Sequence, residues 1–199
     1  MSLLTDQVCI VSGAGQGLGR AVAMEMAREG AKVVLLERNP ETVRQVATEI
    51  SRSGGRAEPH HLDVTNYEAY GKVVADTIEK FGRIDAIVNN AAINPPAKTI
   101  LDDNLDDWRR TIQINLEAVY MGSKLVAPYM AERKEGRIIN IASIQGFAAS
   151  GEVLRGFVRL SCLSFVVTIE LIPHRMPFCA IYFLLLSDRQ LIRFASDLS

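Results

Sequence analysis

The sequence has few cysteines and little net charge. Its three cysteines, Cys9, Cys162 and Cys179, form no CxxC pair and have no histidine partner at the spacing of metal ligands. A small and uneven number of cysteines favours a protein of the reducing cytosol over one held by disulfides. The formal net charge is −1, which argues against binding to nucleic acid or to an anionic membrane surface. We predict no metal site.

The sequence also lacks long apolar runs. Its first residues, MSLLTDQVCIVSG, contain no basic segment followed by a long apolar stretch, so no signal peptide is expected. The longest apolar runs, Phe165–Ile169 and Met176–Leu186, are shorter than the ~18 residues of a membrane-spanning helix. These absences predict a cytoplasmic protein without a membrane span. With 199 residues, one domain with a substantial core is expected.

Apolar segments alternate with helical segments along the first 150 residues. Buried strands are expected at 7–11, 32–36, 84–88 and 137–141, with a strand of weaker apolar pattern near 57–62. Helices are expected at 18–29, 41–52, 66–81 and 105–133. Glycines stand just after the ends of the first three helices, where they suit C-caps. This alternation predicts an α/β fold of βαβ units: a doubly wound parallel sheet, Rossmann-like, in three α/β/α layers.

The composition changes after residue 154. Residues 155–199 contain five of the seven phenylalanines, two of the three cysteines, none of the lysines and a single glycine, Gly156. A continuing α/β fold would need more turn residues than this. We therefore expect one Rossmann domain over residues 1–154 with an incomplete C-terminal part. Residues 155–199 are expected to form a divergent apolar tail, packed on that domain or extending it.

A glycine-rich turn separates the first expected strand from the first expected helix. Gly13, Gly17 and Gly19 form the pattern GxxxGxG. Gly13 permits a tight turn, Gly17 lets the backbone approach a pyrophosphate, and Gly19 allows close packing of the helix. Phosphates would lie at the positive end of a helix that begins near Leu18, with Gln16 in the same loop. The pattern predicts dinucleotide binding; the alternative is a turn with a purely structural role.

The second expected strand ends at Glu37, twenty residues after Gly17. A carboxylate at this place can accept hydrogen bonds from the adenosine ribose and would repel a 2′-phosphate. Arg38 follows directly and could stack on adenine or bind a phosphate. We expect NAD as the cofactor in preference to NADP. The alternative is that Glu37 is only a solvated strand end.

Four further motifs carry a resemblance to a known family. Asp63-Val64-Thr65 follows the third strand, and Asn89-Asn90-Ala91 follows the fourth. Asn115 lies in IQINLEAVY and Ser143 in GRIINIASIQG. With the glycine loop, these motifs occur in the order of the short-chain dehydrogenase/reductase family, which residues 5–152 resemble.

The resemblance implies where a cofactor would lie. Asp63 and Val64 would flank its adenine, and Asn90 would lie along it near the nicotinamide-side ribose. Ala92 stands where the family usually has glycine, a small departure from the pattern. The substrate implied is a small alcohol or carbonyl compound, whose identity the sequence does not specify.

The resemblance also implies alcohol oxidation or ketone reduction by hydride transfer to or from nicotinamide. Relatives use a Tyr for proton transfer, and a nearby Lys lowers the pKa of that Tyr. A Ser holds the substrate oxygen, and an Asn on the long helix anchors a relay water. Ser143 and Asn115 match these two roles. The alternatives are that Ser143 caps a strand end and that Asn115 bonds backbone inside its helix.

The expected Tyr and Lys are absent. The Tyr should follow Ser143 by about a dozen residues and the Lys should come one helical turn later, but the chain has Gly156 and Leu160 in those neighbourhoods. No lysine follows Lys134, and Tyr182 is the only later tyrosine. The Tyr-x-x-x-Lys pair is therefore missing.

One pair elsewhere has the same spacing. Tyr120 and Lys124 match the Tyr-x-x-x-Lys pattern. At about 100° per residue, both lie far around the helix from Asn115. We expect them to face away from the site.

Three functions follow as hypotheses. The first is an NAD-linked oxidoreductase whose catalysis is impaired. The second is a dinucleotide-binding pseudoenzyme or interaction module. The third is a non-functional product, since a frameshift, alternative splice or gene-model error near residue 155 would explain the change in composition. Because relatives commonly associate through the long helix, we also expect either a homodimer through residues 105–133 or poorly defined aggregates.

Overall fold

A computed structural model describes residues 2–95 and 101–142 of the chain. The strands are β1 (Val8–Ser12), β2 (Lys32–Glu37), β3 (Arg56–His61), β4 (Ala86–Asn89) and β5 (Arg137–Asn140). The helices are α1 (Gly17–Arg28), α2 (Pro40–Arg52), α3 (Tyr67–Phe81), α4 (Leu105–Ile112), the π-helical η1 (Gln113–Glu117) and α5 (Ala118–Arg133). Ser143 and the whole segment 155–199 lie outside the described residues.

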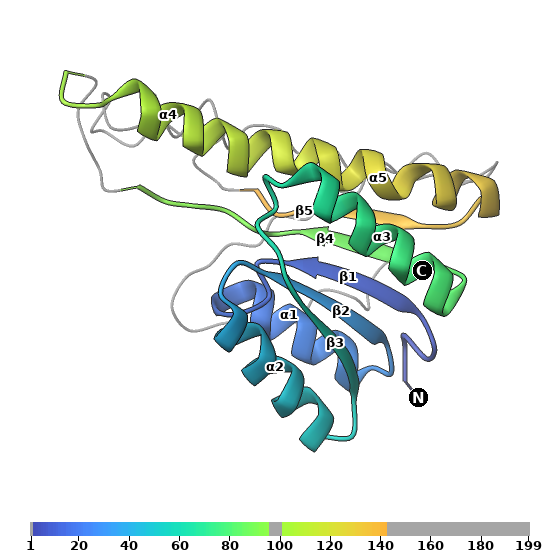
Figure 1. Cartoon of the computed structure of the whole chain (residues 1–199). Coiled ribbons are helices and arrows are strands. Elements are labelled where there is room, and N and C mark those ends of the chain that lie inside the picture. The colour runs from blue at the N-terminus through green and yellow to red at the C-terminus, as the bar shows by residue number, and fades with distance from the viewer. Residues whose placement is uncertain (1, 96–100, 143–199) are drawn as a thin grey trace, which may run out of the picture.

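The five strands form one parallel sheet in the order β3-β2-β1-β4-β5. Helices α1 and α2 cover one face, and α3 with the long α4–α5 rod covers the other (Figure 1). The predicted doubly wound, three-layer fold is confirmed for this part of the chain. Because the connections run to opposite sides of β1, the strand order reverses between β1 and β4, where open α/β sheets bind ligands.

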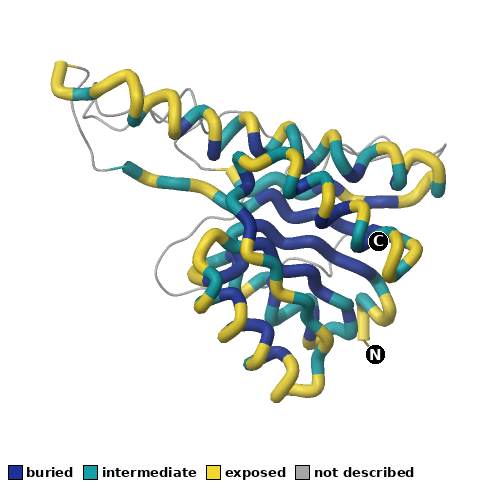
Figure 2. Tube along the Cα trace, viewed as in Figure 1, coloured by how far each residue is buried: buried dark blue, intermediate teal, exposed yellow. Residues whose placement is uncertain are grey.

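The three central strands β2, β1 and β4 are buried on both faces, which is why they lack a polar side, whereas the edge strand β3 has no buried residue (Figure 2). Val8 and Ile10 of β1 join the core beneath α3 and α5. Cys9 and Val11, which alternate with them, join the core beneath α1 and α2. Successive side chains of a strand point to opposite faces, so one short apolar run supplies both cores.

Local sequence signals set the helix ends. The helices α2, α3 and α4 each begin after an asparagine whose side-chain oxygen accepts N–H hydrogen bonds from the first turn: Asn39, Asn66 and Asn104. Gly30, Gly54 and Gly82, which follow α1, α2 and α3, have positive φ, for example 71° at Gly82. Glycine adopts this left-handed conformation without a steric penalty, so these predicted C-terminal signals are confirmed.

The single helix expected over residues 105–133 is wrong in one respect. A π-helical turn, η1, separates α4 from α5. Asn115 lies within it and is bonded to the backbone of Ile93, in the segment that follows β4. A π-helical turn contains one residue more than an α-helical turn, and here it coincides with a contact to a distant segment. The local periodicity of the sequence cannot predict such a contact.

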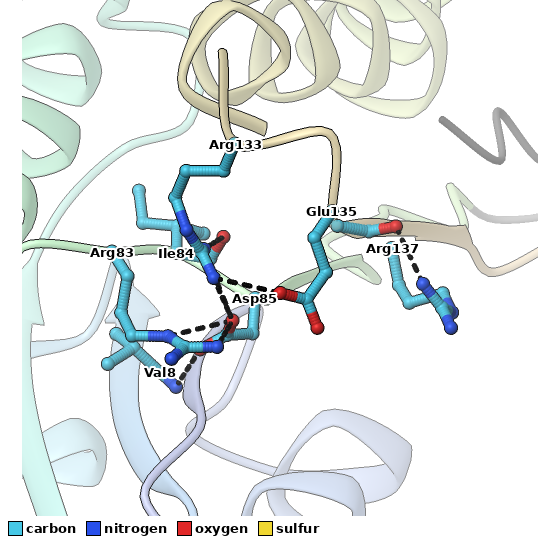
Figure 3. Close-up of polar contacts among 8 residues, drawn as sticks. Val8, Arg83, Ile84, Asp85, Arg133, Glu135 and Arg137 are labelled. Atoms are coloured by element: carbon cyan, nitrogen blue, oxygen red, sulfur yellow. Dashed lines mark hydrogen bonds and ion pairs between the residues drawn. The ribbon is translucent and has the colours of Figure 1, made fainter. Parts of the chain in front are cut away.

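At the amino ends of the strands, an ion cluster joins β1, β4 and α5 (Figure 3). The Asp85 carboxylate, 6% exposed, accepts hydrogen bonds from Val8 N–H at 2.8 Å, from Arg83 and, at 3.2 Å, from Arg133. Burial by itself would raise the pKa of Asp85, but these hydrogen bonds and the adjacent guanidinium charges outweigh it and lower the pKa.

Within residues 2–95 and 101–142, no helix is long and apolar enough to cross a membrane.

Candidate functional site

A cleft of about 350 Å³ opens at the carboxyl ends of β1, β2, β3 and β4. It lies across the point where the strand order reverses. All nine residues predicted to bind a cofactor line it: Gly13, Gln16, Gly17, Leu18, Gly19, Glu37, Asp63, Val64 and Asn90. The fold thus brings together, from four separate segments of the chain, the residues that the sequence motifs single out.

The glycine loop forms the floor between β1 and α1. Gly13 has a φ of +65° and Gly17 one of +53°, a region that residues with a side chain rarely adopt. A Cβ on Gly19 would overlap the carbonyl oxygen of Gly13, so glycine there lets α1 pack directly on the loop. A Cβ on Gly17 would meet nothing within 4 Å, which leaves the loop backbone open to the cleft.

The N-terminus of α1 differs from those of α2, α3 and α4. Gln16 stands at the N-cap position, makes no side-chain cap, and no acidic residue lies in the first turn. The first N–H groups of α1 therefore keep their donor capacity, and the positive end of the helix dipole lies at the cleft. Such a helix end suits an anion such as a phosphate.

Glu37 lies at the end of β2 with both carboxylate oxygens engaged. One oxygen accepts a hydrogen bond from the N–H of Gly15 at 3.1 Å. The other accepts one from the N–H of Asn39, also at 3.1 Å. Glu37 is therefore tied to the glycine loop and is not only a solvated strand end. Sequence reasoning did not single out Gly15, although its place inside the glycine loop was a signal.

Asp63 follows β3 and forms a tight turn with Thr65. Its Oδ1 accepts hydrogen bonds from the Thr65 N–H at 3.0 Å and from the Thr65 hydroxyl at 2.7 Å. Burial alone would raise the pKa of Asp63, but these bonds, with the charges of Arg38 and Arg110, lower it. The carboxylate thus stays ionised beside the buried side chain of Val64.

Asn90 joins β4 to the glycine loop. Its Nδ2 donates to the carbonyl oxygens of Ser12 at 2.9 Å and Gly13 at 3.2 Å. The Ser12 hydroxyl accepts hydrogen bonds from the N–H groups of Asn90 and Ala91 at 3.0 and 3.1 Å. Sequence reasoning missed Ser12, which is 3% exposed. Its signal was a hydroxyl at the end of an otherwise apolar buried strand.

Asn115 does not line the cleft but supports its wall. Its Oδ1 accepts from the Ile93 N–H at 2.9 Å, and its Nδ2 donates to the Ile93 carbonyl at 3.0 Å. Ile93 and the neighbouring Ile114 do line the cleft. The two hydrogen bonds of the Asn115 side chain with Ile93 thus join two segments, whereas the alternative supposed a bond to the backbone inside its own helix.

The remaining sequence candidates fall into two groups. Ser143 lies outside the described residues, as do Gly156 and Leu160. Tyr120 is 61% exposed, with the Lys124 ammonium 5.6 Å from the centre of its ring. Neither lines the cleft, as their helical positions predict. In the part of the chain that the structure describes, no three His, Cys, Asp or Glu side chains group as metal ligands would.

Comparison with known proteins gives one consistent family. The family model described as short chain dehydrogenase matches residues 7–154. An uncharacterized oxidoreductase of Staphylococcus aureus is 38% identical over 147 residues, which are 74% of this chain and 62% of the relative. The chain therefore spans less than two thirds of the length of that relative.

Solved structures agree with the sequence match. A metagenomic short-chain oxidoreductase in complex with NADP is 33% identical, with a TM-score of 0.76 over 81% of this chain and 72% of that one. An NAD⁺-bound xylitol dehydrogenase is 29% identical, also with a TM-score of 0.76, over 81% of this chain and 61% of that one.

Proposed function

This chain belongs to the short chain dehydrogenase family, and we propose that its cleft binds a nicotinamide dinucleotide, NAD in preference to NADP. One observation carries the proposal: the nine predicted residues, distant in sequence, line one cleft at the reversal of the strand order. Structural relatives bound to NADP and to NAD⁺ support the cofactor class.

The geometry of the glycine loop fits a dinucleotide. The uncapped N-terminus of α1 offers N–H groups for a pyrophosphate, and Gly17 leaves room for its approach. Val64, which is buried, and Asp63 would flank the adenine at the ends of the strands. Asn90 would act mainly by holding the loop against β4, because its Nδ2 already donates to the backbone there.

The preference for NAD rests on the sign of one charge. The Glu37 carboxylate lies in the cleft, where it can accept hydrogen bonds from ribose hydroxyls and repel a 2′-phosphate. Arg38, also in the lining, would attract that phosphate. We expect the repulsion by Glu37 to outweigh the attraction by Arg38, because the N–H groups of Gly15 and Asn39 hold the Glu37 carboxylate in position.

We further propose that the chain is an oxidoreductase for a small alcohol or ketone, with impaired turnover. A bound nicotinamide would supply hydride transfer. In this chain, Ser143 would hold the substrate oxygen, and Asn115 would support the wall of the cleft and a relay water. The proton transfer has no tuned group, because no Tyr-x-x-x-Lys pair follows Ser143 at the family spacing.

Steady-state kinetics tests this impairment. A positioned general acid contributes about 10²–10⁴-fold to rate, so we expect turnover at least about a hundredfold below that of an intact relative on matched alcohols and ketones. Robust NAD-linked turnover, lost in Tyr120→Phe or Tyr182→Phe, would contradict the proposal and identify the real proton donor. Phe is the matched replacement because it removes only the hydroxyl.

The missing pair also supports a second function, a dinucleotide-binding pseudoenzyme that acts as a sensor or interaction module. Tight NAD binding with no turnover would favour it. The third hypothesis, a product of a shifted reading frame, is tested by reading the other frames of the coding DNA after residue 154. A frame that encodes Tyr and Lys at the family spacing would support it.

We also propose that the chain forms a homodimer through the α4–α5 rod. Large apolar side chains lie exposed on and just before the rod: Leu101, Leu105, Trp108 and Tyr120. An exposed apolar surface of this kind is typical of an interface. Light scattering should give a mass twice that of a single chain. In Leu105→Lys the measured mass should fall to that of a single chain. A tetramer would contradict the proposal.

A further inference from the structure

Gly15, inside the glycine loop, has no room for a side chain. It is buried, and its N–H donates to the Glu37 carboxylate at 3.1 Å. A Cβ at this position would overlap the Thr42 hydroxyl and lie 2.7 Å from Glu37 Cγ. Its φ lies outside the left-handed region, so the backbone conformation admits any residue. Glycine is needed here for space alone.

The N-terminus of α2 holds the other side of the same carboxylate. The Asn39 N–H donates to the second oxygen of Glu37 at 3.1 Å. The Asn39 side chain in turn accepts the N–H groups of Glu41 and Thr42, at 2.9 and 3.3 Å, and the Thr42 hydroxyl donates to the Asn39 carbonyl. The carboxylate is thus clamped between the glycine loop and the cap of α2.

We infer that Gly15 and Asn39 are positioning residues whose N–H groups fix the Glu37 carboxylate in the cleft, and that selection of a ribose 2′-hydroxyl over a 2′-phosphate depends on this clamp. The inference rests on the proposed function. A carboxylate on a flexible side chain could swing away from an incoming phosphate. Held by two N–H groups, Glu37 cannot withdraw without losing both hydrogen bonds. Arg38 alone would otherwise set the preference in favour of the phosphate.

The first test measures the ratio of the NAD and NADP dissociation constants by equilibrium titration of the full chain. Gly15→Ala should displace the carboxylate and shift the ratio toward NADP by roughly tenfold, the scale of one charge-assisted hydrogen bond. Glu37→Gln should shift it by a similar factor. Gly71→Ala is the matched control, because a Cβ there meets only Leu125, at an ordinary 3.5 Å.

The double variant separates positioning from a direct contact. If Gly15 acts through Glu37, Gly15→Ala should shift the ratio no further in a Glu37→Gln background. Independent, additive shifts would overturn the inference, as would an unchanged ratio in Gly15→Ala. Should Gly15→Ala fail to fold, the further change Thr42→Ala removes the nearest overlap while the 2.7 Å contact with Glu37 Cγ remains.

A second measurement needs no dinucleotide. The Gly15 amide should exchange its proton with solvent slowly in the unaltered chain and at least about tenfold faster in Glu37→Ala, because alanine has no side-chain oxygen to accept its hydrogen bond. Fast exchange of the Gly15 amide proton in the unaltered chain would overturn the clamp but not the proposed function. Failure of both dinucleotides to bind the unaltered chain would instead overturn the proposed function, and the discrimination with it.

Discussion

The two ends of the parallel sheet satisfy their polar groups in opposite ways. At the amino end, the Asp85 carboxylate meets the guanidinium groups of Arg83 and Arg133 and a backbone N–H, and the Glu135 carboxylate also pairs with Arg133, so two positive and two negative charges balance within the chain. At the carboxyl end, side chains such as Asn90 and Glu37 fix the loops, but the first turn of α1 has no side-chain cap. β1 and β4 run from one end to the other.

This difference separates stability from binding. A paired, buried charge stabilises the fold only while its partners remain in place. A helix terminus that lacks a cap gives up some stability but keeps donors for an anion. Substitutions at the amino end should therefore change the free energy of unfolding and leave dinucleotide affinity intact. Substitutions at the carboxyl end should change dinucleotide affinity, whatever they do to the free energy of unfolding.

The largest effect is expected at Gly19. In Gly19→Ala the new Cβ would overlap the Gly13 carbonyl, which is backbone, and the Asn90 side-chain amide, which two hydrogen bonds hold in place. Overpacking of this kind costs about 1–3 kcal/mol, so dinucleotide affinity should fall roughly 10- to 100-fold. Titration with NADH fluorescence measures the loss. Unchanged affinity would break the distinction between the two ends, and Gly71→Ala again serves as the control.

A smaller effect, on stability alone, is expected at Asp85. Asp85→Asn removes the charge that Arg83 and Arg133 share and should lower the free energy of unfolding by about 2 kcal/mol. The folded-state pKa of Asp85 is lowered, so its contribution is present above the unfolded pKa and is lost as pH falls through the folded value. Denaturant unfolding should thus show the two proteins converging in acid, below about pH 4.

That stability difference should come without a change in binding. Asp85→Asn and the unaltered chain should bind NADH with equal affinity at neutral pH. A weaker complex in Asp85→Asn would mean that the two ends of the sheet are coupled.

The smallest effects sharpen the contrast between capped and uncapped helices. Asn66→Ala removes the cap of α3 and should cost about 1 kcal/mol of stability with no change in NADH affinity. Gln16→Asp supplies α1 with a capping carboxylate, and should add up to about 1 kcal/mol while weakening NADH roughly tenfold. Unfolding curves and titrations of both variants give the comparison. Tighter binding in Gln16→Asp would contradict a phosphate at this helix end.

Most of the fold could be predicted because its signals are local. Apolar runs flanked by turn residues indicated β1, β2, β4 and β5, and Gly30 and Gly82 marked helix ends. The signal for β3 was weaker, because its sequence, RAEPHH, is largely polar. The cleft lining followed as well, since the motif residues stand directly after strands whose carboxyl ends meet at one edge of a parallel sheet.

Contacts between distant segments could not be predicted in the same way. The π-helical turn at Asn115 accompanies a bond to Ile93, twenty-two residues earlier in the chain. The packing of Gly15 against Glu37 and the ion cluster around Asp85 likewise join separate segments. Single-sequence periodicity carries no information on which distant groups meet.

The unfolding free energy with and without dinucleotide tests the assignment of the cleft most directly. With NAD at ~100 times its dissociation constant, the chain should gain about 2.7 kcal/mol. NADP at the same concentration should add less, because Glu37 opposes its extra phosphate. Equal or greater stabilisation by NADP would contradict the preference for NAD, and no stabilisation by either would contradict a dinucleotide site.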